Sequence, residues 1–517
     1  MTAEPSGNSR SAAETPASPE TVAVEKPASP KSLVERLLDF LGAFKDLLGL
    51  PAGFWVVVFT FVIESMAYFG VLTLMNSYLT RDLGIADKYA SSFVSVFTML
   101  VTLFMLGAGS YAESFGLRRA ILAALVLCLV GRILYSIVPG LGMSAIITIV
   151  IGSLLIVALG EAILQPVCYS GVKQYTDEKT SSMGYGLIYA LMNAGIVVVG
   201  GLSAWIRPGV QDVLDGVKAT ATNPAASVPK GDLVTGWFAG WTGSGIQAVN
   251  WVCAGITAVT LVGFLLCMSR RVEVNKLRPD TAEQQRERRK REKRSIVDGI
   301  WEYITEGPFG NARFIFFIFM LLPVRTLFAH QWLTMPEYIL RAYPKDVGDY
   351  MEWLVNWINP AIIFVGVPIV TALTRHVNVY TMMILGSLVS AAPTFLLCSG
   401  PNLTMLITYF FLFSIGEAMW SARFLEYASE LAPPGRLAQY MGLANIPWLL
   451  AKGTTGFYSG LMLSKYCPAG APPEQLHTET LWFIYGCIAM VTPIGLVLAR
   501  KWVMSGLMAH KPSHAAA

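Results

Sequence analysis

Long apolar runs recur along the chain from residue 54 almost to its end. A helix needs about 20 apolar residues to cross the hydrocarbon core of a bilayer. The runs are too long and too uniformly apolar for the strands of a membrane barrel, so we expect an all-α membrane protein with twelve transmembrane helices. The expected spans are residues 54–79, 91–111, 119–138, 143–166, 183–205, 246–268, 313–335, 353–374, 378–399, 403–428, 438–464 and 480–503.

The polar ends of the chain predict different structures. Residues 1–32 are rich in Ala, Ser, Pro, Glu and Thr, which indicates a disordered cytoplasmic tail. No charged segment leads directly into an apolar one there, so we expect no cleaved signal peptide. Residues 33–50 place apolar side chains at helical spacing and predict an amphipathic helix on the membrane surface. Residues 504–517 form a second expected cytoplasmic tail.

Positive charges set the expected topology. They gather in the loop at residues 269–312, which contains the runs RRVEVNKLRP and RERRKREKR, and they are sparse in every second loop. By the positive-inside rule, this loop and both termini are cytoplasmic, and the polar loop at 206–245 is extracytoplasmic. The loop separates two six-helix bundles at 51–268 and 313–503. We expect its basic run to contact anionic lipid and no nucleic acid, because neither interleaved aromatic residues nor a binding fold accompanies it.

Composition agrees with a multi-pass protein of a cell membrane, plasma or bacterial inner. Hydrophobic residues make up 54% of the chain, charged residues 14%, and the mean hydropathy is +0.53. The seven Cys lack metal-ligand spacing, and we find no nucleophile–base pair or phosphate-binding glycine loop. We therefore expect neither an enzyme nor a bound metal or cofactor, and we expect a monomer.

The carboxylate of Glu417 lies near the middle of the expected span at 403–428. An ionisable group is costly against lipid, so it should face the interior of a bundle or a wet cavity. A substrate site is one interpretation, and a paired structural glutamate is the other.

The segment GSYAESFGLRR at residues 109–119 lies between the second and third expected spans. It resembles the signature G-x-x-x-D-x-x-G-R-R of the major facilitator superfamily, whose six-plus-six plan this chain shares. The resemblance implies a gating motif, with Glu113 in place of the usual Asp; an ordinary basic turn is the alternative. The residues of the motif are Gly109, Glu113, Gly116, Arg118 and Arg119.

Further segments resemble the proton-dependent oligopeptide transporter family. Gly416-Glu417 is followed by LAP at 431–433 and MG at 441–442. The other segments are ALGEAILQP at 158–166, YALMNAG at 189–195, ESMAYFG at 64–70 and FAHQW at 328–332. Together they cover most of residues 54–503, and their order and spacing carry the resemblance.

The chain also departs from that family at charged positions. Phe61 and Ser65 replace a glutamate and an arginine of the first span, Gln165 replaces a lysine, and His330 replaces an acid. In the family, the lysine and the arginine help to bind the peptide carboxylate and to couple protons. The twelve expected spans leave no room for the two extra central helices of many bacterial members.

The resemblance gives Glu417 the role of binding a substrate amine. An anionic group needs a cation, and the candidates are Arg325, Lys452 and Arg132. Arg132 could instead snorkel from the outer membrane edge. Proton coupling could use Glu64, His330 or Glu417. Glu161 could replace a lost acid or neutralise Arg132 or Arg325. The remaining candidates for the substrate site are Tyr68, Gln165, Asn193, Gln331, Trp332, Trp420 and Trp448.

These observations predict a secondary active transporter that moves a small peptide or another amine-bearing, zwitterionic solute by alternating access. Protons are a candidate second substrate. One alternative is a major facilitator carrier of another organic solute, either an exporter or a facilitator without proton coupling. Another is a membrane sensor or scaffold without transport, in which the loop at 269–312 would bind a partner.

Overall fold

The structure is a computed structural model, and it describes residues 47–114, 116–140, 143–177, 180–222, 231–277, 312–374, 377–430 and 446–509. The chain divides into two compact units, Met1–Leu48 and Gly49–Ala517, and the helices below belong to the second. The tail at 1–32, nearly all of the expected surface helix at 33–50, most of the basic loop and the LAP and MG segments lie outside the described residues. The side chains of Gly109 and Glu113 do so too.

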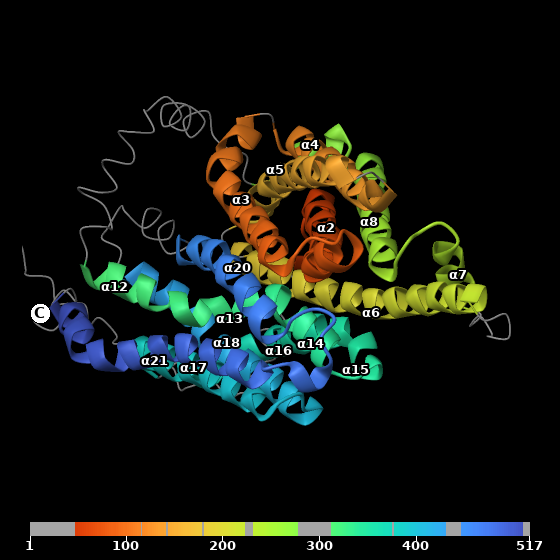
Figure 1. Ribbon diagram of the computed structural model, residues 1–517. Coiled ribbons are helices and arrows are strands. Elements are labelled where there is room, and N and C mark those ends of the chain that lie inside the picture. The colour runs from red at the N-terminus through yellow and green to blue at the C-terminus, as the bar shows by residue number, and fades with distance from the viewer. Residues whose placement is uncertain are drawn as a thin grey trace, which may run out of the picture. The chain divides into compact units, whose positions relative to one another are not determined.

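The N-terminal half of the second unit is helical throughout its described residues. Its elements are α2 (Ala52–Ser77), η1 (Tyr78–Asp82), α3 (Asp87–Ser114), α4 (Leu117–Ile137), η2 (Val138–Gly140), α5 (Met143–Tyr175), α6 (Ser181–Thr222), α7 (Leu233–Ala239), α8 (Gly245–Cys267) and α9 (Arg270–Val274). Figure 1 shows α2 between α3, α5 and α8, with α6 alongside, and α2 packs against all four.

The C-terminal half repeats this all-helical construction in its described residues. Its elements are α12 (Ala312–Met320), α13 (Leu322–Leu333), α14 (Met335–Ala342), α15 (Lys345–Asp349), α16 (Met351–Thr374), α17 (Val379–Ala391), η4 (Ala392–Ser399), α18 (Leu403–Glu430), α20 (Ile446–Tyr466), η5 (Pro473–Gln475) and α21 (Thr478–Ala509). Helix α13 packs against α20 and α21, and α18 packs against α16 and α17.

Each of the twelve apolar runs coincides with helical residues, and an all-helical membrane fold is therefore confirmed. Ten helical stretches of the described chain are long and apolar enough to span a membrane, and Met351–Val367 is a shorter apolar helix. The eleventh expected span, 438–464, overlaps α20 from residue 446 onward, and residues 438–445 lie outside the described residues.

Helix α6 is longer than the expected fifth span, because it continues through Pro208 to Thr222. The expected loop at 206–245 is thus partly helical, and α7 adds a further turn to it. Hydropathy alone cannot separate a polar helix from a polar loop. Residues 209–222 contain Val, Leu, Asp, Lys and Ala, which a helix tolerates outside the bilayer as readily as inside it.

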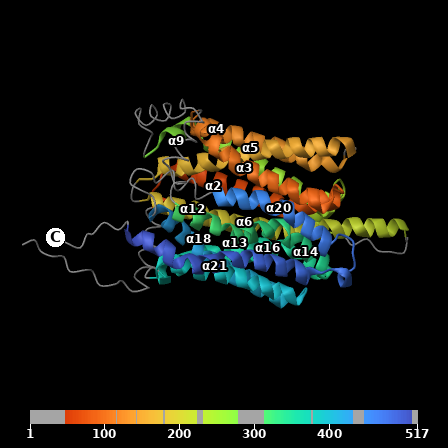
Figure 2. The same ribbon diagram turned by 60° about the vertical axis from the view of Figure 1, so that its left-hand side comes forward.

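The two halves meet along α3 and α20, along α6 and α16, and along α2 and α13. Figure 2 shows α20 running beside α3. Helix α20 offers glycines to this contact: a Cβ at Gly453 would lie 2.8 Å from Met99 Sδ, and a Cβ at Gly460 would lie 2.6 Å from the Asp87 carbonyl oxygen. The Ser95 hydroxyl donates a hydrogen bond of 2.6 Å to the Lys452 carbonyl. Small residues let the two backbones approach closely, as in many membrane helix pairs.

This contact makes a prediction for Gly460. In Gly460→Ala, the new methyl group meets rigid backbone of α3, so we expect the protein to lose about 1–3 kcal/mol of stability. Gly263→Ala is the matched control, because a Cβ there would meet no described atom within 4 Å. Thermal unfolding of both variants in detergent checks the prediction. Equal midpoints for the two variants would contradict the close contact.

Candidate functional site

A cavity of about 260 Å³ lies where the two halves meet. Its walls come from α2, α3 and α6 on one side and from α13, α16, α18 and α20 on the other. The lining residues are Tyr68, Phe69, Leu72, Thr73, Thr98, Tyr189, Met192, Asn193, Ile196, Phe328, Gln331, Trp332, Val355, Asn356, Asn359, Pro360, Glu417, Trp448 and Lys452. Six of the substrate-site candidates from the sequence are among them: Tyr68, Asn193, Gln331, Trp332, Glu417 and Trp448.

Glu417 lines this cavity and remains partly exposed to it. The Asn359 amide donates a hydrogen bond of 2.7 Å to Glu417 Oε2 and another of 3.1 Å to Ser414 Oγ. No ion pair joins Glu417 to a described residue. The amide therefore fixes the carboxylate without neutralising it, which leaves its charge available to a cationic group in the cavity.

Lys452 supplies the cavity with a positive charge. Its Nζ atom is 3.4 Å from Thr102 Oγ1 and 5.4 Å from the centre of the Trp448 ring. A hydroxyl and an aromatic face do not cancel a charge, and no described carboxylate pairs with this ammonium. The Glu417 carboxylate and the Lys452 ammonium thus line the same cavity, and neither forms an ion pair with a described residue.

The cavity also has buried polar atoms that lack a hydrogen-bond partner in the described structure. They are Gln331 Oε1, Trp332 Nε1 and Asn356 Nδ2. The Asn356 Oδ1 atom is already used, because it accepts a hydrogen bond of 2.9 Å from Thr73 across the two halves. Buried polar atoms are normally satisfied by protein, water or ligand. These atoms can therefore orient a polar molecule between the two charges.

Glu64 and Glu161 do not line this cavity and lie within the N-terminal half. Arg132 is 1% exposed, donates to Glu64 and to Thr257, and forms an ion pair of 2.8 Å with Glu161. The interpretation of Arg132 as a snorkelling charge is therefore wrong, since its guanidinium is held between two carboxylates. The expectation that Glu161 neutralises Arg132 is confirmed. Gln165, one turn after Glu161, does not line the cavity either.

Glu64, Glu161 and the thiol of Cys128 gather closely enough to hold a metal ion. The Arg132 guanidinium already donates to both carboxylates. A metal cation would have to displace that charge or be repelled by it, so this cluster fits an internal ion network better than a metal site.

His330 and Trp420 pack beside the cavity without lining it. His330 is 0% exposed, its ring nitrogens contact Thr334 (2.8 Å) and Tyr458 (3.1 Å), and it stacks on Tyr485. Trp420 Nε1 donates a hydrogen bond of 3.3 Å to Ser390. Both side chains are anchored in the core of the C-terminal half.

Arg325 is the exception among the buried cations. It is 3% exposed, and its guanidinium lies 4.3 Å from the centre of the Phe424 ring, 5.6 Å from Trp420 and 5.5 Å from Trp448. Among the described residues, its Nε and Nη1 atoms have no hydrogen-bond partner and no carboxylate pairs with it. Cation–π contacts contribute about 0.5–2 kcal/mol each, whereas burying a charge costs several kcal/mol. Arg325 is thus incompletely compensated.

The segment at 109–119 comprises the last residues of α3, the connection at 115–116 and the first residues of α4. Gly116 has a φ of 84°, a conformation that favours glycine, as expected for a tight turn. The Arg118 side chain donates a hydrogen bond of 2.7 Å to the Met268 carbonyl, and its backbone N–H donates one of 3.2 Å to Glu273. Arg119 is exposed. The turn therefore contacts the segment that leads into the basic loop.

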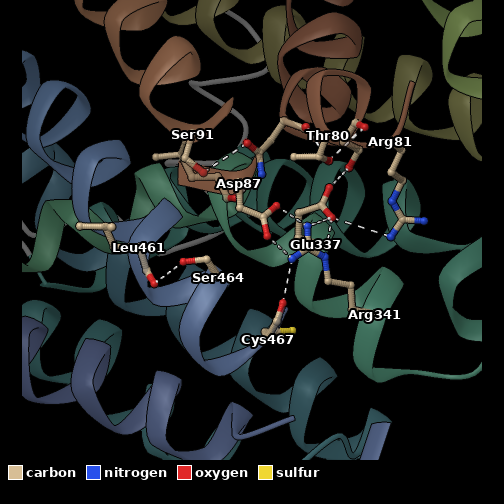
Figure 3. Close-up of polar contacts among 12 residues, drawn as sticks. Thr80, Arg81, Asp87, Ser91, Glu337, Arg341, Leu461, Ser464 and Cys467 are labelled. Atoms are coloured by element: carbon tan, nitrogen blue, oxygen red, sulfur yellow. Dashed lines mark hydrogen bonds and ion pairs between the residues drawn. The ribbon is translucent and has the colours of Figure 1, made fainter. Parts of the chain in front are cut away.

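A cluster of ion pairs joins the halves at the end of the helices that the charge pattern predicts to be extracytoplasmic. Figure 3 shows Arg341 of α14 between Asp87 of α3 and Glu337. The Arg341–Asp87 contacts are 2.6 and 2.8 Å, and the Arg341–Glu337 ion pair is 2.7 Å. Arg81 lies 3.8 Å from Glu337, and Ser77 also donates to that carboxylate. We call Asp87, Glu337 and Arg341 the latch.

A second set of contacts closes the same end. Arg207 of α6 donates to both carboxylate oxygens of Glu352 on α16 and, at 2.6 Å, to the Gly348 carbonyl. Lys345 pairs with Asp212 on the surface, and a hydrogen bond from its ammonium to Asp212 raises the pKa of Lys345. Exposed ion pairs such as Lys345–Asp212 are weakened by water and salt. The buried contacts of Arg207 and Arg341 therefore contribute more to holding the two halves together.

Sequence reasoning did not single out Asp87, Glu337, Arg207 or Glu352. Asp87, Glu337 and Glu352 lie in short loops between expected spans, where a charged residue is common. The available signal was that two loops on the same predicted side each carry both signs of charge. One loop contains Arg81 and Asp87, and the other contains Glu337 and Arg341. Pairing between residues about 250 positions apart cannot be read from one chain.

The latch predicts how the cavity becomes exposed. Arg341→Met leaves Asp87 and Glu337 buried without their shared cation, which costs about 2–5 kcal/mol for a buried charge pair. We expect the predicted extracytoplasmic end to open more often. The measurement is the rate at which an impermeant maleimide, added on that side, labels a cysteine introduced by Leu72→Cys in the cavity wall. Arg81→Met is the control and should change the rate little, because Arg81 is 42% exposed. Unchanged labelling in Arg341→Met would count against the latch.

The buried ion network makes a separate prediction. Arg132→Met strands two carboxylates inside the N-terminal half and should destabilise the protein by about 3–5 kcal/mol. Adding Glu64→Gln and Glu161→Gln to the same variant removes those charges and should restore most of the stability. Denaturation of the single and the triple variant measures the difference. If the triple variant is no more stable than the single one, Arg132 does not act by neutralising these acids.

Comparison with known proteins relates this geometry to a family. The model of the Major Facilitator Superfamily matches residues 17–207 and 231–454, more than half of the chain. No curated protein sequence matches the chain. Many solved structures do match it in fold.

Three of those structures represent the likeness. A peptide transporter POT in complex with sulfate has a TM-score of 0.62 at 16% identity and covers 88% of this chain and 95% of its own. A POT family transporter in complex with 5-aminolevulinic acid has a TM-score of 0.59 at 17% identity, covering 88% and 97%. A bacterial homologue of the human drug peptide transporters has a TM-score of 0.61 at 16% identity, covering 88% and 99%.

At such identities, these structures show the shared fold. The match of the family model, the apolar helices and the cavity between the two halves agree with one another. The chain is an integral, multi-pass membrane transporter and not an enzyme, and it belongs to the major facilitator superfamily.

Proposed function

We propose that this transporter crosses the membrane twelve times with both termini in the cytoplasm and carries a small peptide or another zwitterionic amine by alternating access. The observation that carries the proposal is the placement of Glu417 and Lys452 on one cavity, each without a counter-ion among the described residues. A zwitterion supplies both missing charges at once.

The chemistry of the cavity fits such a ligand. The substrate ammonium would bind the Glu417 carboxylate, which Asn359 holds in place, and the substrate carboxylate would bind Lys452. The unpartnered atoms of Gln331, Trp332 and Asn356 would contact the polar groups between these ends. A volume of about 260 Å³ lies near the lower end of ligand sites, about 300–1,000 Å³, which favours a molecule the size of a dipeptide.

The transport cycle would use the two sets of contacts that join the halves. With the latch and the Arg207–Glu352 pair formed, the predicted extracytoplasmic end is closed. Release of the substrate on the opposite side would be followed by breaking of these pairs, so that the halves rock about the cavity. We place the protein in a plasma or bacterial inner membrane, acting as a monomer.

The solved relatives support this substrate class. One of them is described with 5-aminolevulinic acid, which carries an amine and a carboxylate, and another with a thioalcohol-conjugated peptide. Gln165 and Ser65, which replace family cations, leave the N-terminal half without a cation on the cavity wall among the described residues. In this chain, the anion-binding role would thus fall to Lys452 in the C-terminal half.

Proton coupling is part of the proposal through Glu417. Of the three candidates for this role, only Glu417 lines the cavity, whereas Glu64 is bound to Arg132 and His330 is packed against Tyr485. A carboxylate whose protonation changes with the access state of the cavity would couple movement of the proton to movement of the substrate in the same direction.

Uptake of labelled dialanine into proteoliposomes tests the function. We expect saturable uptake that increases with an inward proton gradient. Glu417→Gln and Lys452→Met should each weaken the apparent affinity about tenfold or more, because each removes one charge-assisted contact. Glu474→Gln and Lys465→Met are matched controls at exposed positions.

Three outcomes would change the proposal. Absence of saturable uptake of any di- or tripeptide would remove the peptide assignment and leave a carrier of another organic solute. Uptake that ignores the gradient would remove proton coupling. Equal losses in the control variants would show that Glu417 and Lys452 have no special role.

A further inference from the structure

Arg325 lies directly behind the cavity wall. The Trp448 ring lines the cavity, and it lies 5.4 Å from Lys452 Nζ and 5.5 Å from the Arg325 guanidinium carbon. One aromatic side chain therefore contacts a cation that lines the cavity and a second cation that does not. Among the described residues, only Trp448 touches both cations and the cavity.

The charges around the cavity do not balance. Glu417 contributes one negative charge, whereas Lys452 and Arg325 contribute two positive charges, and none of the three forms an ion pair with a described residue. A simple zwitterion would satisfy Glu417 and Lys452 and leave Arg325 unpaired. The buried guanidinium would then keep two nitrogens, Nε and Nη1, without an acceptor.

The aromatic rings around Arg325 do not replace an acceptor. Phe424, Trp420 and Trp448 offer ring faces, which attract a cation but accept no directed hydrogen bond of ordinary strength. A guanidinium has a rigid set of N–H donors that matches the geometry of a carboxylate. A carboxylate would both accept hydrogen bonds from the unpartnered N–H groups of Arg325 and supply the negative charge that the cavity lacks.

We propose that Arg325 binds a second carboxylate of the substrate, so that this transporter prefers peptides with net negative charge, such as dipeptides with an acidic side chain. This inference rests on the proposed function, because it assigns the amine to Glu417 and the first carboxylate to Lys452. The acidic side chain reaches Arg325 when the Trp448 ring turns aside. Its binding exchanges a cation–π contact for an ion pair.

A purely structural role for Arg325 gives a different result. A guanidinium that only fills space among aromatic rings would affect stability in the same way for every ligand. An anion-binding guanidinium changes the order in which ligands bind. The discriminating measurement is therefore a comparison of ligands within one variant.

The experiment uses the full chain in detergent and measures the shift in the thermal unfolding temperature with alanyl-glutamate, alanyl-alanine, alanyl-lysine and glutarate. Glutarate has two carboxylates and no amine. The variants are Arg325→Gln and Arg325→Lys. Arg313→Gln is the matched control, because Arg313 also lies over a tryptophan ring, that of Trp502, but at a half-buried position on α12 away from the cavity.

We expect the wild type to bind alanyl-glutamate about tenfold more tightly than alanyl-alanine, and alanyl-lysine least tightly. Arg325→Gln should bind alanyl-alanine as the wild type does and lose the preference for alanyl-glutamate. Arg325→Lys, which keeps the charge, should retain part of the preference even if Arg325→Gln fails to fold. Arg313→Gln should resemble the wild type.

The remaining outcomes separate this inference from the proposed function. If no dipeptide binds but glutarate stabilises the wild type and not Arg325→Gln, the anion site is supported while the peptide function fails. If alanyl-glutamate and alanyl-alanine bind equally to the wild type, or if Arg325→Gln keeps the preference, the inference is overturned.

Discussion

A charge inside a bilayer must find a partner of opposite charge or face water, and this constraint organises the whole structure. Arg132 meets it through ion pairs, since its guanidinium donates to the carboxylates of Glu64 and Glu161 and to the Thr257 hydroxyl. Arg207 and Arg341 meet it between the two halves, through Glu352 and through Asp87 with Glu337. Glu417 and Lys452 face the cavity without a counter-ion in the described chain, and Arg325 is buried without one. They are the places where the protein has unused binding capacity.

The contrast between these groups separates architecture from function. Fully compensated ions keep a fixed arrangement, because breaking them exposes a bare charge to an apolar surrounding. Ions compensated across the two halves can be exchanged for water when the halves separate, so they suit a reversible closure. Uncompensated ions gather at the cavity, where a substrate can supply what is missing. The same physical cost thus produces rigidity in one place and recognition in another.

The sequence predicted the helices well and the pairings poorly. Apolar runs of membrane-spanning length have few alternatives to a helix, so each expected span coincides with helical residues. The placement of Glu417 at mid-membrane depth followed from its position within such a run. For Arg132, the sequence offered pairing with Glu161 as one of several alternatives and did not indicate Glu64, because both acids come from other helices and a choice between snorkelling and pairing depends on which faces meet. The extension of α6 past Pro208 was missed because its polar residues resemble those of a loop. The contacts of Arg341 join residues 254 positions apart, and no local pattern encodes them.

The glycines of α20 have a mechanical consequence. Gly453 and Gly460 bring the backbone of α20 against α3 over about two turns, or about 10 Å of helix. At Gly460 the two helices have little room to move closer, since a Cβ there would meet backbone atoms of Asp87 and Lys88, whereas at Gly453 it would meet the Met99 side chain. Tilting of one half against the other would pivot at the Gly453 end of this contact, because the Gly460 end lies at Asp87, which belongs to the latch. The ends on either side of it move in opposite directions, as the arms of a lever do, so that one mouth narrows as the other widens. Close packing of α3 against Gly453, Gly456 and Gly460 of α20 would in this way make one end of the cavity close as the other opens, without a contact that joins the two ends.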